Sequence, residues 1–284
     1  MPQLLFRTDD GTIQVDYTKR IGYFTMSGDH AHEGCELYYL FAGERDYFIR
    51  DRTYRVRAGE FVFIEKGELH RTLDTGVPDH ERVVFNFDER LLDRIPRLAS
   101  NGVFRLPPPE RRKGETLARE LIDESRGAAP GRDAMVEALL RQLLLLVFRS
   151  AAARTAEDEA PPTAAHRTMS EVAAYVGERY AESLLLKDVA ERFFVSPYYL
   201  SRKFKACTGF GFAEYVQLVR VREAQRLLRE TNLKMHDIAE RVGIGPAANF
   251  HKLFKKVCGC SPLQYRKGRR AAASSAGAAA DPNR

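Results

Sequence analysis

The chain has 284 residues, of which 44% are hydrophobic and 10% aromatic, and it carries a net charge of +6 at pH 7. The length allows two domains with separate cores, and the composition excludes a disordered or collagen-like chain. The longest apolar run, Leu143–Phe148, is far below the roughly 18 residues of a membrane helix, and residues 1–10 lack the pattern of a signal peptide. Four scattered cysteines exclude a disulfide framework, so we expect a soluble cytoplasmic protein.

The positive charge is concentrated in the C-terminal part of the sequence. Between Thr168 and Arg270 there are 19 Lys and Arg but only 10 Asp and Glu, so this segment has a net charge of +9 and the remainder −3. A basic segment beside a mildly acidic one predicts a polyanionic partner for the C-terminal half alone.

Short runs of alternating hydrophobic and polar residues, separated by turn residues, fill the chain up to about Asp88. This period of two is typical of strands with one buried face. The predicted strands cover residues 36–40, 47–49, 54–56, 61–64 and 82–87. The first half of the chain is therefore expected to be mainly β.

Polar residues of metal-binding type lie in and beside these strands: His30, His32, Glu36 and His70. The first three have the same parity, so on one strand they would point to the same side. Three imidazoles and one carboxylate could hold Zn, Fe, Ni or Mn. These four residues therefore form a candidate site inside the β domain.

The spacing His-x-His-x3-Glu-x6-Gly, which ends at Gly43, resembles the first motif of the cupin barrel. Gly59, followed by Gly67-x2-His70, resembles the second motif, and the resemblance covers about residues 20–90. The departures from the motifs are Phe24 in place of Gly, Glu65 in place of Pro and Asp74 in place of Asn. The resemblance implies a barrel whose His and Glu side chains point inward.

Three interpretations of this interior remain open: an effector pocket without metal, a metal site, or purely structural histidines. The effector pocket would comprise His30, His32, Glu36, Tyr38 and His70, and the metal site the same residues without Tyr38. Tyr47, Phe63 and Phe85 are further candidates for the pocket walls. We expect that the protein requires no cofactor. If it binds one, the candidate is a divalent metal in the barrel.

The hydrophobic period changes to three and four residues between Glu115 and Arg149, which predicts two amphipathic helices with a break at Gly127–Gly131. These helices could cap the barrel or join two copies of the chain. Apolar residues on the second helix favour a homodimer: Leu139, Leu143, Leu146 and Phe148. Residues 151–167 are rich in Ala, Pro and acids and predict a linker.

An internal repeat occupies the C-terminal region. Asp188–Arg192 recurs as Asp237–Arg241, at an offset of 49 residues. After one inserted residue, three further matches follow at an offset of 50: Phe204-Lys205 with Phe254-Lys255, Gly209 with Gly259, and Tyr215 with Tyr265. A short helix, a turn and a longer helix are therefore predicted twice.

Each copy has the pattern of a helix-turn-helix. Val195-Ser196-Pro197 and Ile244-Gly245-Pro246 form the turns, with Pro at the start of the next helix. Second helices are predicted at 198–208 and 247–258, each with an apolar face and a cationic face. An amphipathic helix over 212–229, about 27 Å long, joins the copies and could place them in successive major grooves. A helical domain with merely solvated lysines is the alternative.

Residues 169–267 resemble the DNA-binding domain of the AraC/XylS family of bacterial regulators. The resemblance includes the closing pattern Phe254-Lys255-Lys256, Gly259-Cys260-Ser261-Pro262 and Tyr265-Arg266-Lys267. It implies that both second helices contact DNA, and the candidate residues are Tyr198, Ser201, Arg202, Lys203, Lys205, Asn249, His251, Lys252, Lys255 and Lys256. Ala247 and Ala248 depart from the polar residues that are frequent in the family. Since alanine cannot read a donor or acceptor, the second helix is expected mainly to hold phosphates.

We therefore expect an α+β protein: a cupin-like barrel with two following helices, then an all-α domain of two helix-turn-helix units joined by a long helix. The expected boundaries are 1–110 for the barrel, 111–150 for the dimerisation helices, 151–167 for the linker, 168–268 for the DNA-binding domain and 269–284 for a disordered tail. The expected function is a DNA-binding transcription regulator that responds to a small-molecule effector. The alternative is a metal-dependent cupin enzyme fused to a DNA-binding domain.

The expected partners are operator DNA, a small-molecule effector for which a sugar is one candidate, and a second copy of the chain. If the protein is an activator, RNA polymerase is a further expected partner.

Overall fold

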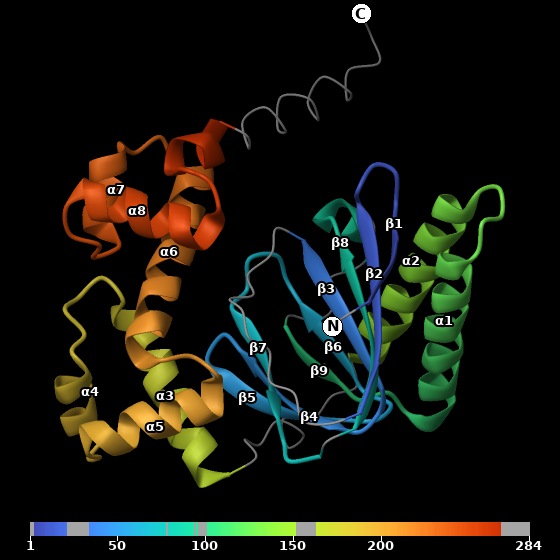
Figure 1. The fold of residues 1–284 in the computed structure, drawn as a ribbon, viewed down its shortest axis with the longest axis horizontal. Coiled ribbons are helices and arrows are strands. Elements are labelled where there is room, and N and C mark those ends of the chain that lie inside the picture. Colours follow the sequence, from blue (N-terminus) through green and yellow to red (C-terminus); the bar gives the residue numbers. More distant parts are fainter. Residues whose placement is uncertain are drawn as a thin grey trace, which may run out of the picture. The chain divides into compact units, whose positions relative to one another are not determined.

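The structure is a computed structural model that describes residues 3–21, 34–77, 79–93, 95, 101–151 and 163–267. The chain folds as two compact units (Figure 1). The first unit reaches Ser170, and the second takes in most of the chain from Glu171 onward. Each unit is described by itself below. Among the described helices, none is long and apolar enough to cross a membrane.

The first unit consists of two antiparallel sheets that face each other. Its strands are β1 (Gln3–Arg7), β2 (Ile13–Arg20), β3 (Cys35–Ala42), β4 (Glu44–Ile49), β5 (Arg52–Arg57), β6 (Phe61–Ile64), β7 (His70–Asp74), β8 (His80–Phe87) and β9 (Gly102–Phe104). The larger sheet has the order β1-β2-β8-β3-β6-β9 and the smaller β5-β4-β7. One buried cluster takes Tyr38 and Val84 from the larger sheet and Tyr47 and Val56 from the smaller. The space between the sheets is therefore the barrel interior.

Two helices cover the other face of the larger sheet (Figure 1): α1 (Pro108–Arg126) and α2 (Arg132–Ala151). Side chains alternate along β3, so Leu37 and Tyr39 join the helix-side core while Tyr38 and Leu40 face the interior. A short 3-10 helix, η1 (Glu89–Leu92), follows β8 and adds Leu91 and Leu92 to the helix-side core. The helices thus close one face of the sheet and leave the interior to the smaller sheet.

Two residues expected in the pocket walls lie on the wrong side of the sheet for that role. Phe63 and Phe85 belong to the helix-side core, and Phe63 packs edge-on against Phe148 of α2 with ring centroids 5.0 Å apart. Both residues pair in register with Leu37 of β3, so their side chains lie on the face of the sheet opposite to Tyr38. Leu143 and Phe148 of the expected dimer surface are also buried within this unit.

The five predicted strands and the two helices after the barrel are present, but several elements extend beyond the prediction. Strands β1, β2, β7 and β9 were not predicted. Helix α1 begins at Pro108 rather than Glu115, because two prolines fit the first helical positions. Helix α3 (Ala164–Arg179) begins inside the expected linker, where the Thr163 hydroxyl accepts the His166 N–H at 3.3 Å. Residues 152–162 and the tail from residue 268 lie outside the described residues.

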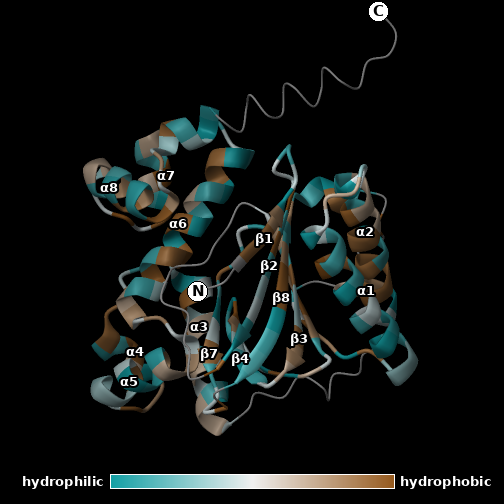
Figure 2. Cartoon of the chain, turned by 45° about the vertical axis from the view of Figure 1, so that its right-hand side comes forward, coloured by the Kyte–Doolittle hydropathy of each residue, from teal (hydrophilic) through white to brown (hydrophobic). Residues whose placement is uncertain are grey.

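The second unit is helical throughout its regular structure, as predicted. After α3 come α4 (Leu186–Arg192), α5 (Pro197–Thr208), α6 (Phe212–Glu230), α7 (Met235–Arg241) and α8 (Ala247–Cys258), and residues 262–267 are also helical. Bands of hydrophilic and hydrophobic residues alternate along α6 in Figure 2, as an amphipathic helix between two cores requires. The architecture is therefore mixed α+β, with the all-α part at the C-terminal side.

Candidate functional site

The first helix-turn-helix consists of α4 and α5. Ala190 of α4 is fully buried, which allows close approach to Leu200 and Phe204 on the inner face of α5. The Ser196 hydroxyl accepts the Tyr199 N–H at 3.1 Å and caps α5, with Pro197 as its first residue. In the turn, Phe194 has a φ of 55° and is 97% exposed.

The second helix-turn-helix repeats this arrangement in α7 and α8. Ala239 is buried beneath Phe250 and Phe254 of α8. Its turn contains Gly243 at φ 70° and Gly245 at φ 23°, and α8 has no side-chain cap. The repeat predicted from sequence is therefore a structural repeat.

Matching aromatic pairs hold each second helix in place. Phe204 and Tyr215 meet edge-on with ring centroids 5.3 Å apart, and Phe254 and Tyr265 do the same at 5.5 Å. Each pair joins a recognition helix to the helix that follows it, and such pairs add about 0.5–1.5 kcal/mol beyond the burial of their area. The cores of the two copies are therefore packed in the same way.

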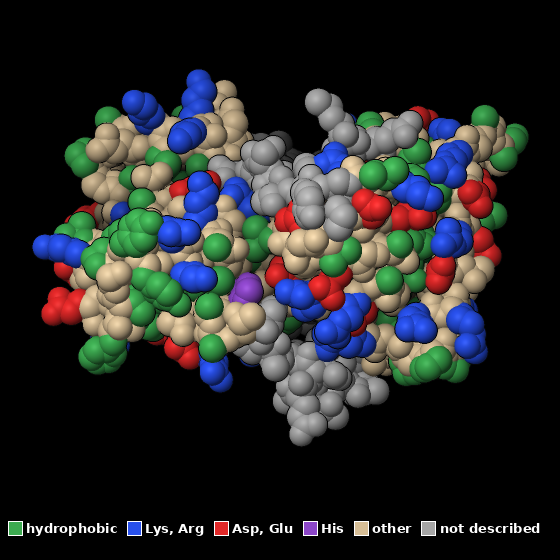
Figure 3. Space-filling view, turned by 60° about the horizontal axis from the view of Figure 1, so that its bottom comes forward, with side chains coloured by type: hydrophobic (Ala, Val, Ile, Leu, Met, Phe, Trp, Pro, Cys, Tyr) green, Lys and Arg blue, Asp and Glu red, His purple; other side chains and the backbone are tan. Residues whose placement is uncertain are grey.

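The outer faces of α5 and α8 carry all ten residues expected to contact DNA, and every one of them is exposed. In Figure 3, Lys and Arg side chains are spread over the visible face of the second unit, among hydrophobic ones. Arg202 is held in position on α5, because its Nη1 donates to the Tyr198 hydroxyl at 3.0 Å and its guanidinium lies 5.5 Å from the Tyr198 ring centre. Tyr198 itself is 71% exposed.

Helix α6 connects the two copies and is fixed at its middle. With 19 residues it is about 28 Å long. Arg220 donates from Nε to the Tyr180 carbonyl and from an Nη to the Glu182 carbonyl, both at 2.7 Å. Burial lowers the pKa of Arg220. A side chain at Gly243 would come within 2.5 Å of the Ala181 carbonyl, so the turn of the second copy packs against the same connection.

Inside the barrel, the Glu36 carboxylate lies between the side chains of Tyr47 and His70. Its Oε1 accepts the Tyr47 hydroxyl at 2.7 Å, and its Oε2 lies 3.6 Å from His70 Nε2. The other ring nitrogen of His70 lies 2.9 Å from the Glu68 carbonyl. All three side chains are buried, and burial raises the pKa of Tyr47. The structure thus brings Glu36, Tyr38 and His70 to the interior.

Sequence reasoning missed a second polar group in the interior: Arg45 and Arg82 lie near Tyr38, and His80 lies near both arginines. Arg45 is 1% exposed and Arg82 is 8% exposed. Burial, reinforced by Arg45 and Arg82, lowers the pKa of His80 to about 4, so His80 is neutral at pH 7. Burial also raises the pKa of Tyr38 to about 12. Period-two alternation along β8, which puts His80 and Arg82 on the same face as Val84, was the signal that could have found part of this group.

The expected metal site is only half described. His30 and His32 lie outside the described residues. Within the described part of the chain, no group of three or more His, Cys, Asp or Glu side chains is placed to hold a metal ion. Glu36 and His70 are close enough to bind one ion together, and they could equally hydrogen-bond a ligand.

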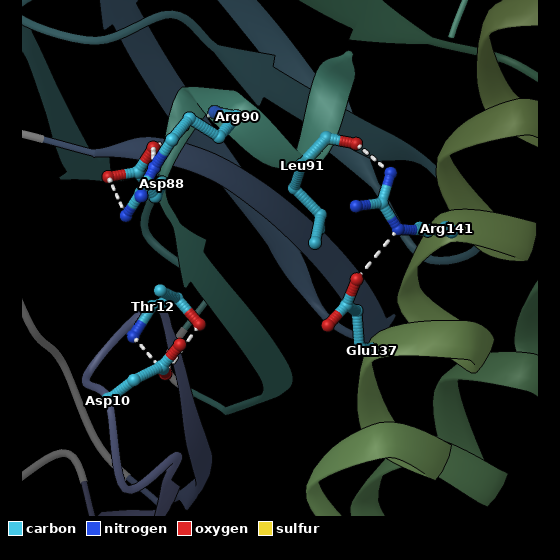
Figure 4. Close-up of a pocket in the computed structure, with 7 residues that line it drawn as sticks. All are labelled: Asp10, Thr12, Asp88, Arg90, Leu91, Glu137 and Arg141. Carbon is cyan, nitrogen blue, oxygen red and sulfur yellow. Dashed lines mark hydrogen bonds and ion pairs between the residues drawn. The ribbon is translucent and has the colours of Figure 1, made fainter. Parts of the chain in front are cut away.

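A pocket of about 160 Å³ lies on the outside of the first unit, between the β1–β2 turn, η1 and α2 (Figure 4). Its charged groups already have partners: Arg90 binds Asp88 at 3.0 Å, and Arg141 binds Glu137 at 2.9 Å and the Leu91 carbonyl at 2.7 Å. Because these charges already have partners, we assign no ligand to this pocket.

Known proteins match the chain over both units. The family described as AraC-like ligand binding domain matches residues 22–144, and the family described as helix-turn-helix domain matches residues 189–268. The HTH-type transcriptional activator RhaR of Klebsiella pneumoniae is 29% identical over 86% of this chain and 89% of its own length. RhaR of Escherichia coli K12 is 25% identical over 84% of this chain and 86% of its own length.

A solved structure, the C-terminal domain of the response regulator AraT from Geobacillus stearothermophilus, is 37% identical over 38% of this chain and 89% of that chain, with a TM-score of 0.36. The relatives named above are transcriptional activators. The two family matches fall on the two units, one on the barrel with its helices and the other on the helix-turn-helix repeat. The chain therefore combines an AraC-like ligand-binding domain of the cupin type with a C-terminal helix-turn-helix DNA-binding domain, which is the arrangement of an AraC-type transcription regulator.

Proposed function

We propose that the protein reads operator DNA chiefly with α5, anchors it with α8, and alters this binding when an effector occupies the barrel. The observation that carries the proposal is the pair of exposed cationic helices on matching cores at the two ends of α6. Their spacing, set by a rod of about 28 Å, suits consecutive major grooves on one side of a duplex.

Base reading is assigned to α5 because of its side chains. Arg202 can form two hydrogen bonds to guanine, and Tyr198 holds the guanidinium ready for them. At the start of α8, Ala247 and Ala248 are exposed but can offer only methyl contacts, whereas Lys252, Lys255 and Lys256 suit phosphates. Asn249 and His251 are the remaining polar candidates on that helix.

The effector site is assigned to the barrel interior, where Glu36, Tyr38, Tyr47 and His70 lie buried together. The Tyr38 hydroxyl has no hydrogen-bonding partner among the described residues, and because a buried polar atom without one is costly, a polar ligand is expected to supply it. We assign no catalytic step to this group. If a metal contributes, dialysis against a chelator will abolish the effector response, and metal analysis of the purified protein will show about one ion per chain.

The protein is further proposed to act as a homodimer and, as the names of the relatives above suggest, as an activator. In that role we propose that it contacts RNA polymerase. Helix α2 presents Met135 and Leu145, which are 51% and 38% exposed, on its outer side. Analytical ultracentrifugation should show a dimer for the wild type and a monomer for Leu145→Glu. A monomeric wild type would contradict this part of the proposal.

The decisive experiment is to sequence the genomic DNA fragments retained by the purified full-length protein and to derive a binding motif from them. A triple variant, Lys252→Ala with Lys255→Ala and Lys256→Ala, should lose most affinity for every fragment. Lys113→Ala, which removes an exposed charge from α1 of the first unit, serves as the control and should bind as the wild type. Retention of random fragments with no common motif would overturn the proposal.

A further inference from the structure

One end of the barrel interior carries two buried arginines around a buried tyrosine. Arg45 lies at the start of β4 and Arg82 near the start of β8, where Leu40 of β3 is its neighbour in register. The Arg82 guanidinium lies 5.7 Å from the centre of the Tyr38 ring, and the Tyr38 and Tyr47 rings meet edge-on at 5.1 Å. Burial lowers the pKa of Arg45, and the nearby Arg82 contributes to this shift.

In this group, the Tyr38 hydroxyl and Nδ1 of His80 have no hydrogen-bonding partner among the described residues. Tyr38 is fully buried and His80 is 3% exposed. A buried donor without a partner costs free energy, and a native protein keeps such a group when something else satisfies it. These atoms therefore point to a bound molecule.

Positive charges gather at one end of the interior. After burial, Arg45, Arg82 and Arg20 all contribute to the lowered pKa of His80, and Asp74, which faces Arg45 across the β4–β7 register, opposes them. Asp16 and Glu36 also carry negative charge, but Asp16 is hydrogen-bonded by Gln14 and Asn86, and Glu36 by Tyr47 with His70 beside it. The end of the interior that holds Arg45 and Arg82 is therefore complementary to an anion.

We propose that the ligand of the barrel is a small hydroxylated carboxylic acid whose carboxylate binds at Arg82 and Arg45. The guanidinium groups match the planar carboxylate, and the Tyr38 hydroxyl donates a further hydrogen bond. Glu36, Tyr47 and His70 then face the hydroxyl groups of the same molecule. This inference rests on the proposed role of the barrel as effector site, and it names the chemistry of the effector.

The test uses the full-length protein and two matched pairs of probes in thermal unfolding. D-Glucuronate and D-glucose differ only in a carboxylate, and sodium acetate is compared with sodium chloride at equal ionic strength. Glucuronate and acetate should raise the Tm by about 3 °C relative to glucose and chloride, as binding at about ten times Kd predicts.

The diagnostic variant is Arg82→Met, which removes the charge and keeps most of the side-chain length. It should lose the Tm response to glucuronate and acetate, because one of the two guanidinium groups of the site has been removed. Arg119→Met is the control, since Arg119 also lies over a ring, that of Phe41, but is 53% exposed outside the barrel. It should respond to both carboxylates as the wild type does.

Equal Tm values with carboxylate and neutral probes, or an Arg82→Met variant that responds to the carboxylates as the wild type does, would overturn the carboxylate site. Operator binding is measured in the same preparations. Intact, effector-dependent operator binding would then show that only the chemistry assigned to the ligand is wrong, whereas absent operator binding would show that the proposed function itself is wrong.

Discussion

The two helix-turn-helix copies keep the same interior but have different outer faces. Inside, Phe204 with Tyr215 and Phe254 with Tyr265 form equivalent pairs, and an alanine lies at the helix crossing in both copies. Outside, Arg202 corresponds to Lys252 and Tyr198 to Ala248 at the offset of 50 residues. Packing requirements fix the shared residues, while the exposed positions are free to specialise. The difference indicates that one copy reads sequence and the other supplies affinity.

The turns of the two copies also differ, and again the first copy has the more specialised residues. Ser196 caps α5, but Gly245 occupies its place before α8 and provides no cap. Phe194 takes a left-handed backbone conformation that Gly243 adopts without strain in the second copy. The start of the first recognition helix is therefore more firmly defined than that of the second.

The largest effect is expected in the shared interior. Phe204→Ala and Phe254→Ala should each lower the free energy of unfolding by about 3–5 kcal/mol, because each removes one ring of an equivalent aromatic pair and leaves a cavity in the core. Chemical denaturation followed by circular dichroism measures both. A loss confined to one variant would show that the two cores are not equivalent.

The next largest effect separates the two outer faces. Arg202→Ala should weaken binding to the cognate operator by about 5- to 150-fold, or about 1–3 kcal/mol, and relax the preference at one base pair. Lys252→Ala should weaken all sequences alike. Competition binding with operators mutated at single positions distinguishes the two. Were Arg202→Ala to weaken every sequence equally, Arg202 would be a phosphate contact.

A smaller effect is expected from the cap of the first recognition helix. Ser196→Ala should lower the free energy of unfolding by about 1 kcal/mol, since the Tyr199 N–H loses its acceptor. Ser201→Ala on the same helix is the control for stability and should change it little. An unchanged Ser196→Ala variant would mean that Pro197 alone is sufficient to start the helix.

The smallest effect concerns the two lysines that correspond between the copies. Lys205→Ala and Lys255→Ala should each reduce the dependence of log affinity on log salt by about 0.9, the value for one lost phosphate contact. Titrations between low and physiological salt measure this slope. A slope that changes in only one variant would show which of the two helices lies farther from the backbone of the DNA.

The helical unit could be predicted from the sequence because its information is local and repeated. The matches Asp188–Arg192 with Asp237–Arg241 and Phe204 with Phe254 located both turns, and α8 has the bounds that were predicted. Helices α5 and α6 each differ from the prediction by one residue at one end, whereas α3 begins inside the expected linker, because Thr163 provides a cap within a segment whose composition is typical of linkers.

The barrel was harder to predict because its interior is polar. Strand β7 carries His70, Arg71 and Thr72, all buried, and their polarity hides the strand from a hydrophobic pattern. The prediction that Phe63 and Phe85 line the pocket was wrong for a related reason. Helices cover the apolar side of the larger sheet, so these two rings lie on that side, away from the pocket. Buried arginines such as Arg45 cannot be told from surface ones in a strand without knowing which face is enclosed.

The hydrogen bonds of Arg220 and the close approach at Gly243 have a consequence for the operator. They tie the segment before the first copy, the middle of α6 and the turn of the second copy together, so the two recognition helices keep one separation. Inserting one base pair between the two DNA segments would move the second by about 3.4 Å and rotate it by about 36° around the duplex axis. A rigid unit cannot follow that rotation, so α8 would lose its contacts while α5 kept its own. The spacing and helical phase of the operator are therefore recognised by the backbone of this unit, in addition to the bases that its side chains read.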